Sequence, residues 1–510
     1  MRADVGTITG SQQAKTAVSN RAMHTITNIM RPTSGKAGRS PGQDPFPALV
    51  GDGRKARTLD GSFVDYIDAD NAATTRPFAL VNEKVQELLS VYGSVHRGSG
   101  VNSQVSTEVF DKARQLLVEF VGGDENRLAV CYTQNTTSAI NKLSRKLRLN
   151  PASGDRVFLS EFEHSSNDLP WRSSDPVRIG ASEAGSLDIE ALDRALSSAP
   201  RTGTKLVAVT GASNLTGALT PIHEIATVTH EYGGLLLVDA AQLVAHRPIR
   251  MVGTGQGDHI DFLAFSGHKM YAPYGGGVLI GDRAILTEAP PDELGGGTID
   301  FATPMQFDLT HDAFRRENPG TPNVVGAVAM ALAGLVLRNV AGFDAIIRHE
   351  QQLLDAARDS WTGIAGLRVL CDLDYTASKK CAILSFVMEG YEHGLLAARL
   401  SHEFGIGVRH GHLCQHGYVA RLLGLTASEV EDIRRSVLGH DQGAMYGVVR
   451  ASLGVANRVE DVFRMGKALE EIKNTPFRNE VYVRTASGEW WPKGRPQDAG
   501  SDFFLFQEER

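Results

Sequence analysis

The middle of the chain alternates short apolar runs with longer amphipathic stretches. The apolar runs have the length of strands and end in small or polar residues; they occupy residues 127–133, 156–160, 205–213, 234–241, 261–267 and 276–282. Strands of this apolar character, separated by helical stretches, are typical of a parallel sheet that helices cover on both faces. We therefore expect a large α/β domain over residues 60–320, with entry helices near residues 80–91 and 104–120.

A second pattern begins after residue 320. A long helix rich in Ala, Leu and Val precedes apolar runs at residues 381–389, 405–411 and 446–454, which are again separated by helical stretches. This order predicts a smaller α+β domain over residues 321–473. A cleft is expected between the two domains.

The two ends of the chain differ from this pattern. Residues 1–59 are rich in Ser, Thr, Gly, Pro and Arg and poor in acids, which predicts a disordered leader, with an organellar transit peptide as the alternative. Residues 474–510 form a C-terminal extension. Its alternation around the sequence ASGE predicts a hairpin, with Trp490 and Trp491 as packing anchors.

Composition narrows the class of protein. The net charge of −7 gives no reason to expect a nucleic-acid or anionic-membrane partner, since those partners require concentrated positive charge. The four cysteines show no paired CxxC spacing, so we expect neither a disulfide framework nor a metal site. No apolar run approaches the length of a bilayer span. A cytoplasmic protein is expected, with organellar import through the leader as the alternative.

Two of the apolar runs end in residues that can carry chemistry. Asp239 and Gln242 follow one buried run, and Ser266, His268 and Lys269 follow another. The carboxyl ends of parallel strands share one edge of a sheet, where ligands collect. Both groups are therefore expected to face one crevice.

These residue types suit pyridoxal 5′-phosphate (PLP). Lys269 can form a Schiff base with the cofactor aldehyde if burial or nearby positive charge keeps its amine neutral. Asp239 would keep the pyridine nitrogen protonated, so that the ring can accept the electron pair of a broken substrate bond. Gln242 would donate a hydrogen bond to the ring hydroxyl. His164, which follows the apolar run at residues 156–160, would stack on the ring.

The cofactor phosphate requires hydrogen-bond donors. Ser266 and His268 can supply them, and a strand-to-helix junction upstream offers hydroxyls and helix N-terminal N–H groups at Asn135, Thr136 and Thr137. Each residue also has an ordinary interpretation, because a single aspartate after a strand is commonly a helix cap and a single lysine a solvated charge. Their order along the chain favours the cofactor site.

The motifs occur in an order that resembles the class V aminotransferase superfamily of PLP-dependent enzymes, in particular its cysteine desulfurase and selenocysteine lyase branch. The resemblance covers residues 65–470 and rests on DNAAT, VHRG, TTSAIN, EHSSN, SNLTG, VDAAQ, FSGHKMY, GGGT and GTPN. It implies the fold type I architecture, a homodimer with active sites at the subunit boundary, and PLP attached to Lys269. It also implies that Thr321 reaches the phosphate in the neighbouring subunit, and that substrate contacts involve Asn214, Asn71 and His96.

The reaction depends on a later segment, GIGVRHGHLCQHGY. It resembles the desulfurase segment in which an arginine, here Arg409, binds the substrate carboxylate and a cysteine, here Cys414, attacks sulfur; Arg450 resembles the second carboxylate-binding arginine. Nearby histidines or the cofactor charge would favour the Cys414 thiolate. The resemblance implies removal of sulfur, or selenium, from cysteine or a related amino acid through an external aldimine and a Cys414 persulfide.

The chain departs from the family between Cys414 and Arg450, where the connection is longer than in the familiar desulfurases. It is expected to contain a helix near Thr426 with TASE as a capping box. This insertion puts the reach of Cys414 and the docking of a sulfur-acceptor protein in doubt. The alternatives are another class V enzyme (C–S lyase, aminotransferase or epimerase) in which Cys414 is a packing residue, and an inactive binding scaffold.

Overall fold

A seven-stranded sheet forms the centre of the larger lobe in the computed structural model, which describes residues 46–181, 185–371, 376–439, 443, 445–475, 481–485 and 487–496. In spatial order its strands are β4 (Leu128–Thr133), β10 (Gly277–Asp282), β9 (Phe262–Ser266), β8 (Leu235–Asp239), β7 (Lys205–Thr210), β5 (Arg156–Ser160) and β6 (Val177–Ile179). The prediction of a mainly parallel sheet is confirmed. The exception is β10, which was predicted parallel but runs antiparallel to β4 and β9.

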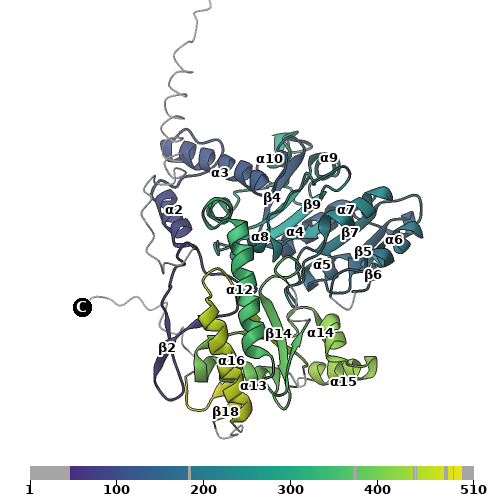
Figure 1. The fold of residues 1–510 in the computed structure, drawn as a ribbon. Coiled ribbons are helices and arrows are strands. Elements are labelled where there is room, and N and C mark those ends of the chain that lie inside the picture. Colours follow the sequence, from purple (N-terminus) through teal and green to yellow (C-terminus); the bar gives the residue numbers. More distant parts are fainter. Residues whose placement is uncertain are drawn as a thin grey trace, which may run out of the picture.

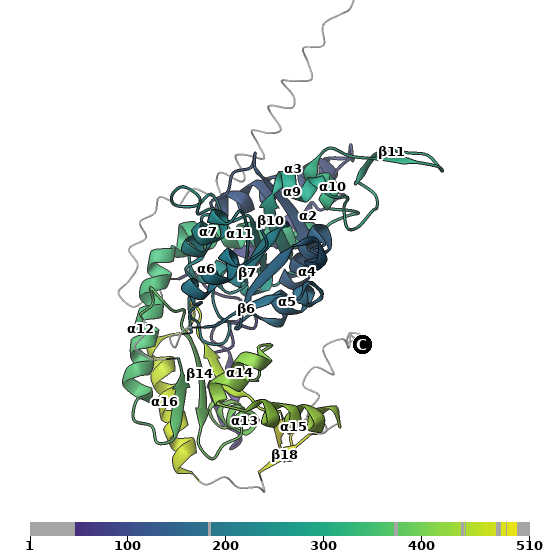
Figure 2. The same ribbon diagram turned by 90° about the vertical axis from the view of Figure 1, so that its right-hand side faces the viewer.

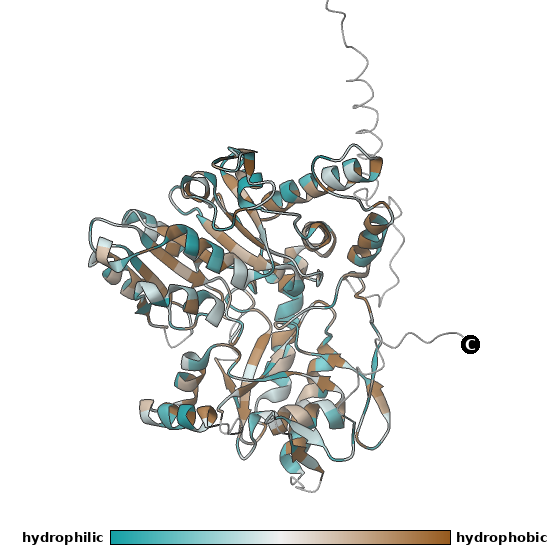
Figure 3. Cartoon of the chain, turned by 180° about the vertical axis from the view of Figure 1, so that it is seen from behind, coloured by the Kyte–Doolittle hydropathy of each residue, from teal (hydrophilic) through white to brown (hydrophobic). Residues whose placement is uncertain are grey.

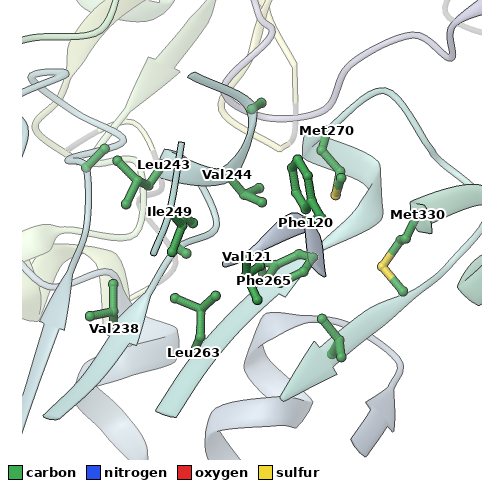
Figure 4. Close-up of a cluster of buried hydrophobic side chains, with 14 of the residues drawn as sticks. Phe120, Val121, Val238, Leu243, Val244, Ile249, Leu263, Phe265, Met270 and Met330 are labelled. Carbon is green, nitrogen blue, oxygen red and sulfur yellow. The ribbon is translucent and has the colours of Figure 1, made fainter. Parts of the chain in front are cut away.

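Helices cover both faces of this sheet (Figure 1). They are α2 (Ala79–Ser90), α3 (Val101–Phe120), α4 (Thr136–Leu147), α6 (Ile189–Ser197), α7 (Ile222–Glu231) and α11 (Val324–Leu335). Successive strand residues enter different apolar clusters: Leu237 packs in one cluster and Val238 in the other. Figure 4 shows part of the cluster that contains Val238, including Phe120, Val121 and Phe265. This two-sided burial explains the near-continuous apolar strands.

Shorter helical segments connect these elements. They are η1 (Pro151–Ser153), α5 (Ser165–Asp168), η2 (Leu169–Ser174), α8 (Leu243–His246), η3 (Gly267–Lys269), α9 (Arg283–Glu288) and α10 (Ala313–Glu317). A hairpin of β11 (Ile299–Ala302) and β12 (Phe307–Leu309) projects from the larger lobe (Figure 2).

The boundary between the lobes differs from the predicted position at residue 321. Helix α11 and the π-helical segment η4 (Val336–Ala341) pack into the core of the larger lobe, and α12 (Phe343–Trp361) then runs into the smaller lobe. The stretch Val324–Ala341 has 18 residues and a mean hydropathy of 1.9, enough to cross a membrane by length and composition, but 67% of it is buried in the protein. Sequence alone did not separate such a core helix from the domain that follows it.

The smaller lobe contains a four-stranded antiparallel sheet. Its strands, in spatial order, are β13 (Leu367–Leu370), β14 (Ile383–Met388), β17 (Val448–Ser452) and β16 (Arg409–Gly411). Helices α12, α13 (His393–Phe404) and α16 (Val459–Asn474) pack around this sheet. The strands are apolar and the outer helix faces polar, as the colours of Figure 3 show.

The N-terminal segment also belongs to the folded protein before residue 60. Phe46 and Leu49 are buried in the larger core, and β1 (Lys55–Arg57) pairs with β2 (Phe63–Asp65). Strand β3 (Ile67–Asp68) then pairs with β15 (Ile406–Gly407) of the smaller lobe. The predicted leader of residues 1–59 is therefore too long at its C-terminal end, and its first 45 residues lie outside the described residues.

Two late features lie on the smaller lobe. The insertion after Cys414 forms α14 (His416–Leu423) and α15 (Ala427–Leu438), and the predicted capping box is present between Thr426 and Glu429. At the C-terminal end, β18 (Tyr482–Arg484) and β19 (Trp490–Pro492) form a hairpin where the sequence predicts one. Trp490 donates a hydrogen bond to Glu392 (3.0 Å).

Candidate functional site

A cavity of about 340 Å³ lies at the carboxyl ends of β5, β7, β8 and β9. Most of the residues predicted to form the site line it: Asn135, Thr136, Thr137, His164, Asn214, Asp239, Gln242, Ser266, His268, Lys269, Arg409, Cys414 and Arg450. Both lobes contribute, because Arg409, Cys414 and Arg450 come from the smaller one. The sequence therefore predicted which strand ends meet.

Lys269 ends η3, immediately after β9, and its amine faces this cavity. Burial lowers the pKa of Lys269, the charge of Asp239 opposes this effect, and the charge of Arg450 adds to it. Gly267 allows Met330 of α11 to pack closely against the turn before Lys269, because a Cβ at position 267 would lie 2.6 Å from Met330 Cγ. A lowered pKa increases the fraction of the neutral amine, the form that nucleophilic attack requires.

Asp239 is the last residue of β8 and is buried. The N–H of Ala241 donates to its Oδ1 (2.9 Å). Burial raises the pKa of Asp239, whereas this hydrogen bond and the charge of Lys269 lower it. A positively charged ligand group beside Asp239 would stabilise the ionised carboxylate in place of the water that burial excludes.

Glu163 lies behind the part of the cavity wall that Asp239 forms, and it was not among the residues predicted from the sequence. Its carboxyl group accepts hydrogen bonds from the N–H of Thr210 (2.9 Å) and from Asn167 Nδ2 (2.7 Å). Burial raises the pKa of Glu163 to about 8, although its hydrogen bonds oppose the shift. Glu163 is therefore mostly neutral near pH 7, which avoids a second negative charge beside Asp239. Its position directly before His164 was the available signal.

The N-terminus of α4 forms an anion-binding corner. Asn135 caps the helix by accepting from the N–H of Ser138 (2.9 Å), and Ser266 Oγ accepts from the N–H of Thr136 (2.7 Å). Thr137 Oγ1 lies 2.7 Å from the hydroxyl of Ser166. Gly277 of β10 allows the backbone of Asn135 to lie directly against the sheet, because a Cβ at position 277 would lie 2.4 Å from Asn135 Cα. Hydroxyls and a helix N-terminus together suit a phosphate group.

Two histidines on the cavity are held neutral. Burial lowers the pKa values of His164 and His268 to about 4, and the charge of Lys269 contributes at both. His164 Nδ1 accepts from the N–H of Ser166 (3.1 Å), so its protonated ring nitrogen is Nε2. A neutral ring fixed in this way can lie against a flat cofactor.

Gln242 links the cavity to the N-terminal segment. Its side-chain Nε2 donates to the carbonyl oxygen of Ala72 (2.6 Å), and the residue is buried. Ala72 and Ala73 line the cavity beside it.

Both predicted carboxylate-binding arginines contact Asp70. Arg450 Nη2 donates to Asp70 Oδ1 (2.9 Å), and Arg409 Nη2 lies 2.9 Å from Asp70 Oδ2. Strand pairing explains the convergence, because Arg409 and Arg450 are direct partners in the β16–β17 register. Asp70 was not among the predicted residues, although it directly precedes Asn71 in the DNAAT motif.

Cys414 lies on the cavity wall and is exposed. Leu413 and Cys414 both have left-handed backbone conformations, with φ of 51° and 59°. The Cys414 carbonyl oxygen accepts from Ser165 N (3.0 Å) and Ser165 Oγ (2.9 Å), while the Cys414 N–H donates to His412 Nδ1 (3.2 Å). Consecutive left-handed residues are costly without glycine and persist where surrounding contacts hold them.

Asn214 fixes this loop from the other side. Its Nδ2 donates to the Leu413 carbonyl oxygen (3.0 Å), and its Oδ1 accepts from Gln415 Nε2 (2.7 Å). Its own carbonyl oxygen accepts from Arg450 Nη1 (3.0 Å). The long insertion therefore does not draw Cys414 away from the cavity, because α14 and α15 begin only after Gln415.

Two histidines beside Cys414, His412 and His416, have lowered pKa values. The rings of His412 and His416 are stacked with centroids 3.5 Å apart. Burial lowers the pKa of His412 to about 4 and also lowers the pKa of His416. The lowered pKa values argue against His412 and His416 as the source of positive charge for a Cys414 thiolate. The cofactor charge, the other source predicted from the sequence, does not depend on them, and the guanidinium groups of Arg409 and Arg450 line the same cavity.

Three predicted residues lie outside this cavity. Asn71 donates to the carbonyl oxygen of Ser452 (3.1 Å) and to Asn457 Oδ1 (3.2 Å), so it joins the N-terminal segment to the smaller lobe. His96 packs its ring edge against Phe110, with centroids 6.0 Å apart. Thr321 is exposed and lines a second cavity. Within one chain, none of the three is placed to contact a ligand in the first cavity.

Comparison with known proteins agrees with this geometry. The sequence pattern of the family Aminotransferase class-V matches residues 67–465. A probable cysteine desulfurase of Halalkalibacterium halodurans is 30% identical over 428 residues, covering 81% of this chain and 94% of that protein. A probable cysteine desulfurase of Vibrio cholerae is 30% identical over 443 residues, covering 84% and 96%.

Solved structures lead to the same family. The apo structure of a cysteine desulfurase from Thermococcus onnurineus NA1 aligns with a TM-score of 0.69 and 28% identity, covering 80% of this chain and 95% of that chain. The matches confirm the resemblance and the fold type I architecture. Because the family pattern covers most of the residues that build the sheet, the cavity and the Cys414 loop, the chain belongs to the class-V aminotransferase family of PLP-dependent enzymes.

Proposed function

We propose that this protein is a cysteine desulfurase that binds PLP covalently through Lys269 and transfers the sulfur of L-cysteine, or the selenium of its analogue, to Cys414. The observation that carries the proposal is that one cavity brings together the Lys269 amine, two arginines and an exposed cysteine thiol. The named relatives, probable cysteine desulfurases, support the same reaction.

The residues of the cavity fit PLP. The α4 N-terminus with Ser266 and His268 would hold the phosphate, Asp239 the pyridine nitrogen, Gln242 the ring hydroxyl and His164 the ring face. When bound there, PLP supplies an electron sink for the pair released at the substrate α-carbon. The buried Lys269 amine, whose pKa burial lowers, fits both the attachment of the cofactor and the removal of the α-proton.

The substrate carboxylate would bind at the two arginines. Among the described residues, Arg450 Nε is buried without a hydrogen-bond partner, so this guanidinium has a donor left for a ligand. Cys414 would attack the substrate sulfur as a thiolate: an S–S bond forms, the C–S bond breaks, and the carbon skeleton becomes alanine after protonation. The exposed Cys414 can then pass sulfur to an acceptor thiol of another protein or to a reductant.

Product analysis tests this function. The purified protein with PLP, L-cysteine and a thiol reductant is expected to release alanine and sulfide in equal amounts. Pyruvate with sulfide would indicate a C–S lyase, a keto acid without sulfide an aminotransferase, and D-cysteine an epimerase. Each of these products in place of alanine would overturn the proposal.

Asp70 should act as a competitor for the substrate carboxylate, because it occupies both arginines. Asp70→Asn is expected to lower the KM for L-cysteine by about 5- to 10-fold, which corresponds to about 1 to 1.4 kcal/mol, with little change in kcat. Initial rates of alanine formation measure both constants. Asp65→Asn, an exposed carboxylate on the same segment, is the control. A higher KM in Asp70→Asn would mean that Asp70 positions the arginines instead.

We also propose that the protein is a homodimer with its active sites near the subunit boundary. The β11–β12 hairpin projects from the larger lobe and exposes Phe301, Met305 and Phe307, with Met305 92% exposed. Exposed apolar side chains on a projecting hairpin are typical of an interaction surface. The second cavity, which Thr321 lines, shares Thr137 with the Lys269 cavity, so a partner subunit bound at Thr321 would lie near the phosphate end of the site.

A further inference from the structure

A second group of polar side chains lies at the opposite ends of the strands that carry Asp239 and Lys269. His230 lies in the last turn of α7, and His259 and Asp261 come just before β9. The potential ligand atoms of these three residues lie within 4.8 Å of one another. Neither the cofactor site nor the Cys414 loop uses them.

The distances between potential ligand atoms in this group are close to those between neighbouring ligand atoms around a bound metal ion. His230 Nε2 lies 2.9 Å from Asp261 Oδ2, and His259 Nε2 lies 3.3 Å from Asp261 Oδ1. Ligand atoms around a tetrahedral Zn²⁺ with bonds of about 2.0 Å are separated by about 3.3 Å. The two imidazole rings are stacked with centroids 4.1 Å apart and planes at 19°, so both can turn Nε2 toward the same carboxylate.

The hydrogen bonds around His230 select the nitrogen that faces Asp261. The Gly257 carbonyl oxygen lies 2.6 Å from His230 Nδ1 and can only accept, so Nδ1 carries a proton. In the neutral ring, Nε2 therefore presents a lone pair to the carboxylate. This is the arrangement of a metal-binding histidine, whose other nitrogen donates to a backbone carbonyl.

Asp261 is anchored for the same role. The N–H of Leu236 donates to Asp261 Oδ2 (2.7 Å), and the residue is buried. A cavity of about 20 Å³ opens beside His259 and Asp261, and its other polar lining residues are Asp124, Asp282 and Arg127. This volume holds about one water molecule, which could complete a four-coordinate shell.

We propose that His230, His259 and Asp261 form a binding site for a divalent transition-metal cation such as Zn²⁺. The cation would join the end of α7 to the starts of β8 and β9, away from the cofactor cavity. Without metal, the hydrogen bond to Asp261 raises the pKa of His230, which favours a proton on Nε2. Metal binding displaces that Nε2 proton, and the His259 ring binds through Nε2 with its proton on Nδ1. Cysteine spacing could not reveal such a site.

Metal titration tests the proposal on the full PLP-loaded protein after chelator treatment and alkylation of exposed thiols. Competition with a chromogenic chelator should show one saturable Zn²⁺ equivalent, which His259→Ala weakens by about 10-fold or more. His311→Ala, which removes an exposed histidine outside the group, should bind as wild type. His259 is suitable because it is partly exposed and its removal leaves the His230–Asp261 pair in place.

Two further measurements do not depend on the variant. Co²⁺ bound to wild type should give the intense visible absorption of tetrahedral coordination, and Zn²⁺ should raise the Tm of wild type but not of His259→Ala. Equal Zn²⁺ affinity in His259→Ala and His311→Ala would overturn the site. So would the absence of a saturable equivalent and of a cobalt spectrum in wild type, which would leave the group as an ion pair.

Discussion

Replacing Lys269 with alanine is expected to lower the rate of alanine formation from L-cysteine by on the order of 10³-fold or more. Lys269 is the lysine that lines the cavity, and burial lowers the pKa of its amine. Under the proposed function this one group would serve both cofactor attachment and proton transfer. No neighbouring side chain combines a primary amine with this position. The loss should therefore appear in kcat and persist at saturating substrate.

The same variant has a spectroscopic outcome. Wild type reconstituted with PLP should show the visible absorption of a lysine-bound pyridoxal group and retain it covalently after borohydride treatment, at Lys269 by peptide mapping. Lys269→Ala should lose both signals, whereas Lys467→Ala, which removes an exposed lysine of α16, should keep them. Turnover at the wild-type rate in Lys269→Ala would contradict the assigned role. Lys269→Arg should also lose both signals, because it keeps a long basic side chain at this position but its guanidinium cannot form the covalent bond.

The residues proposed to hold the cofactor ring could be predicted from the sequence, because each of them lies at or just after the end of its own strand. Asp239 ends β8, and Lys269 ends η3 directly after β9; because β8 and β9 are adjacent and parallel, two local patterns suffice to place both residues on one edge. The helix cap at Asn135 follows the same logic. These assignments need no knowledge of long-range contacts beyond the direction of the strands.

Contacts between distant segments were not predictable in this way. Asp70 meets Arg450 across 380 positions, and no local pattern marks that pairing. The motif that contains Asn71 was correctly singled out, but Asn71 binds backbone and Asn457 while its neighbour Asp70 meets the arginines. Two adjacent residues of one motif therefore have entirely different partners.

The lobe boundary was misplaced for a related reason. An apolar helix such as α11 reads the same whether it packs on the first lobe or opens the second, and only its contacts with α2 and α3 decide. Strand direction has the same limit, because the apolar run of β10 is identical in a parallel and an antiparallel neighbour position. The hydrophobic pattern of a segment therefore predicts whether it is a helix or a strand, whereas its neighbours in the fold depend on tertiary packing.

Cys414→Ser is expected to reduce sulfide release from L-cysteine by on the order of 10²-fold or more, while leaving the visible absorption of the bound cofactor unchanged. A serine hydroxyl fits the same loop, and the contacts that hold residue 414 are made by its backbone, so the loop should stay in place. The hydroxyl cannot accept a sulfur atom to form a persulfide.

Mass spectrometry after incubation with L-cysteine should find one added sulfur on the wild-type peptide that contains Cys414. Cys371→Ser is the matched control, because Cys371 is partly exposed but does not line the cavity. Lys269→Ala and Cys414→Ser together separate the competing enzymes. Loss of activity in Lys269→Ala with full activity in Cys414→Ser would retain a PLP enzyme and reject the desulfurase. Loss in both, with sulfur trapped on Cys414, requires that the same cavity holds the cofactor and the sulfur acceptor.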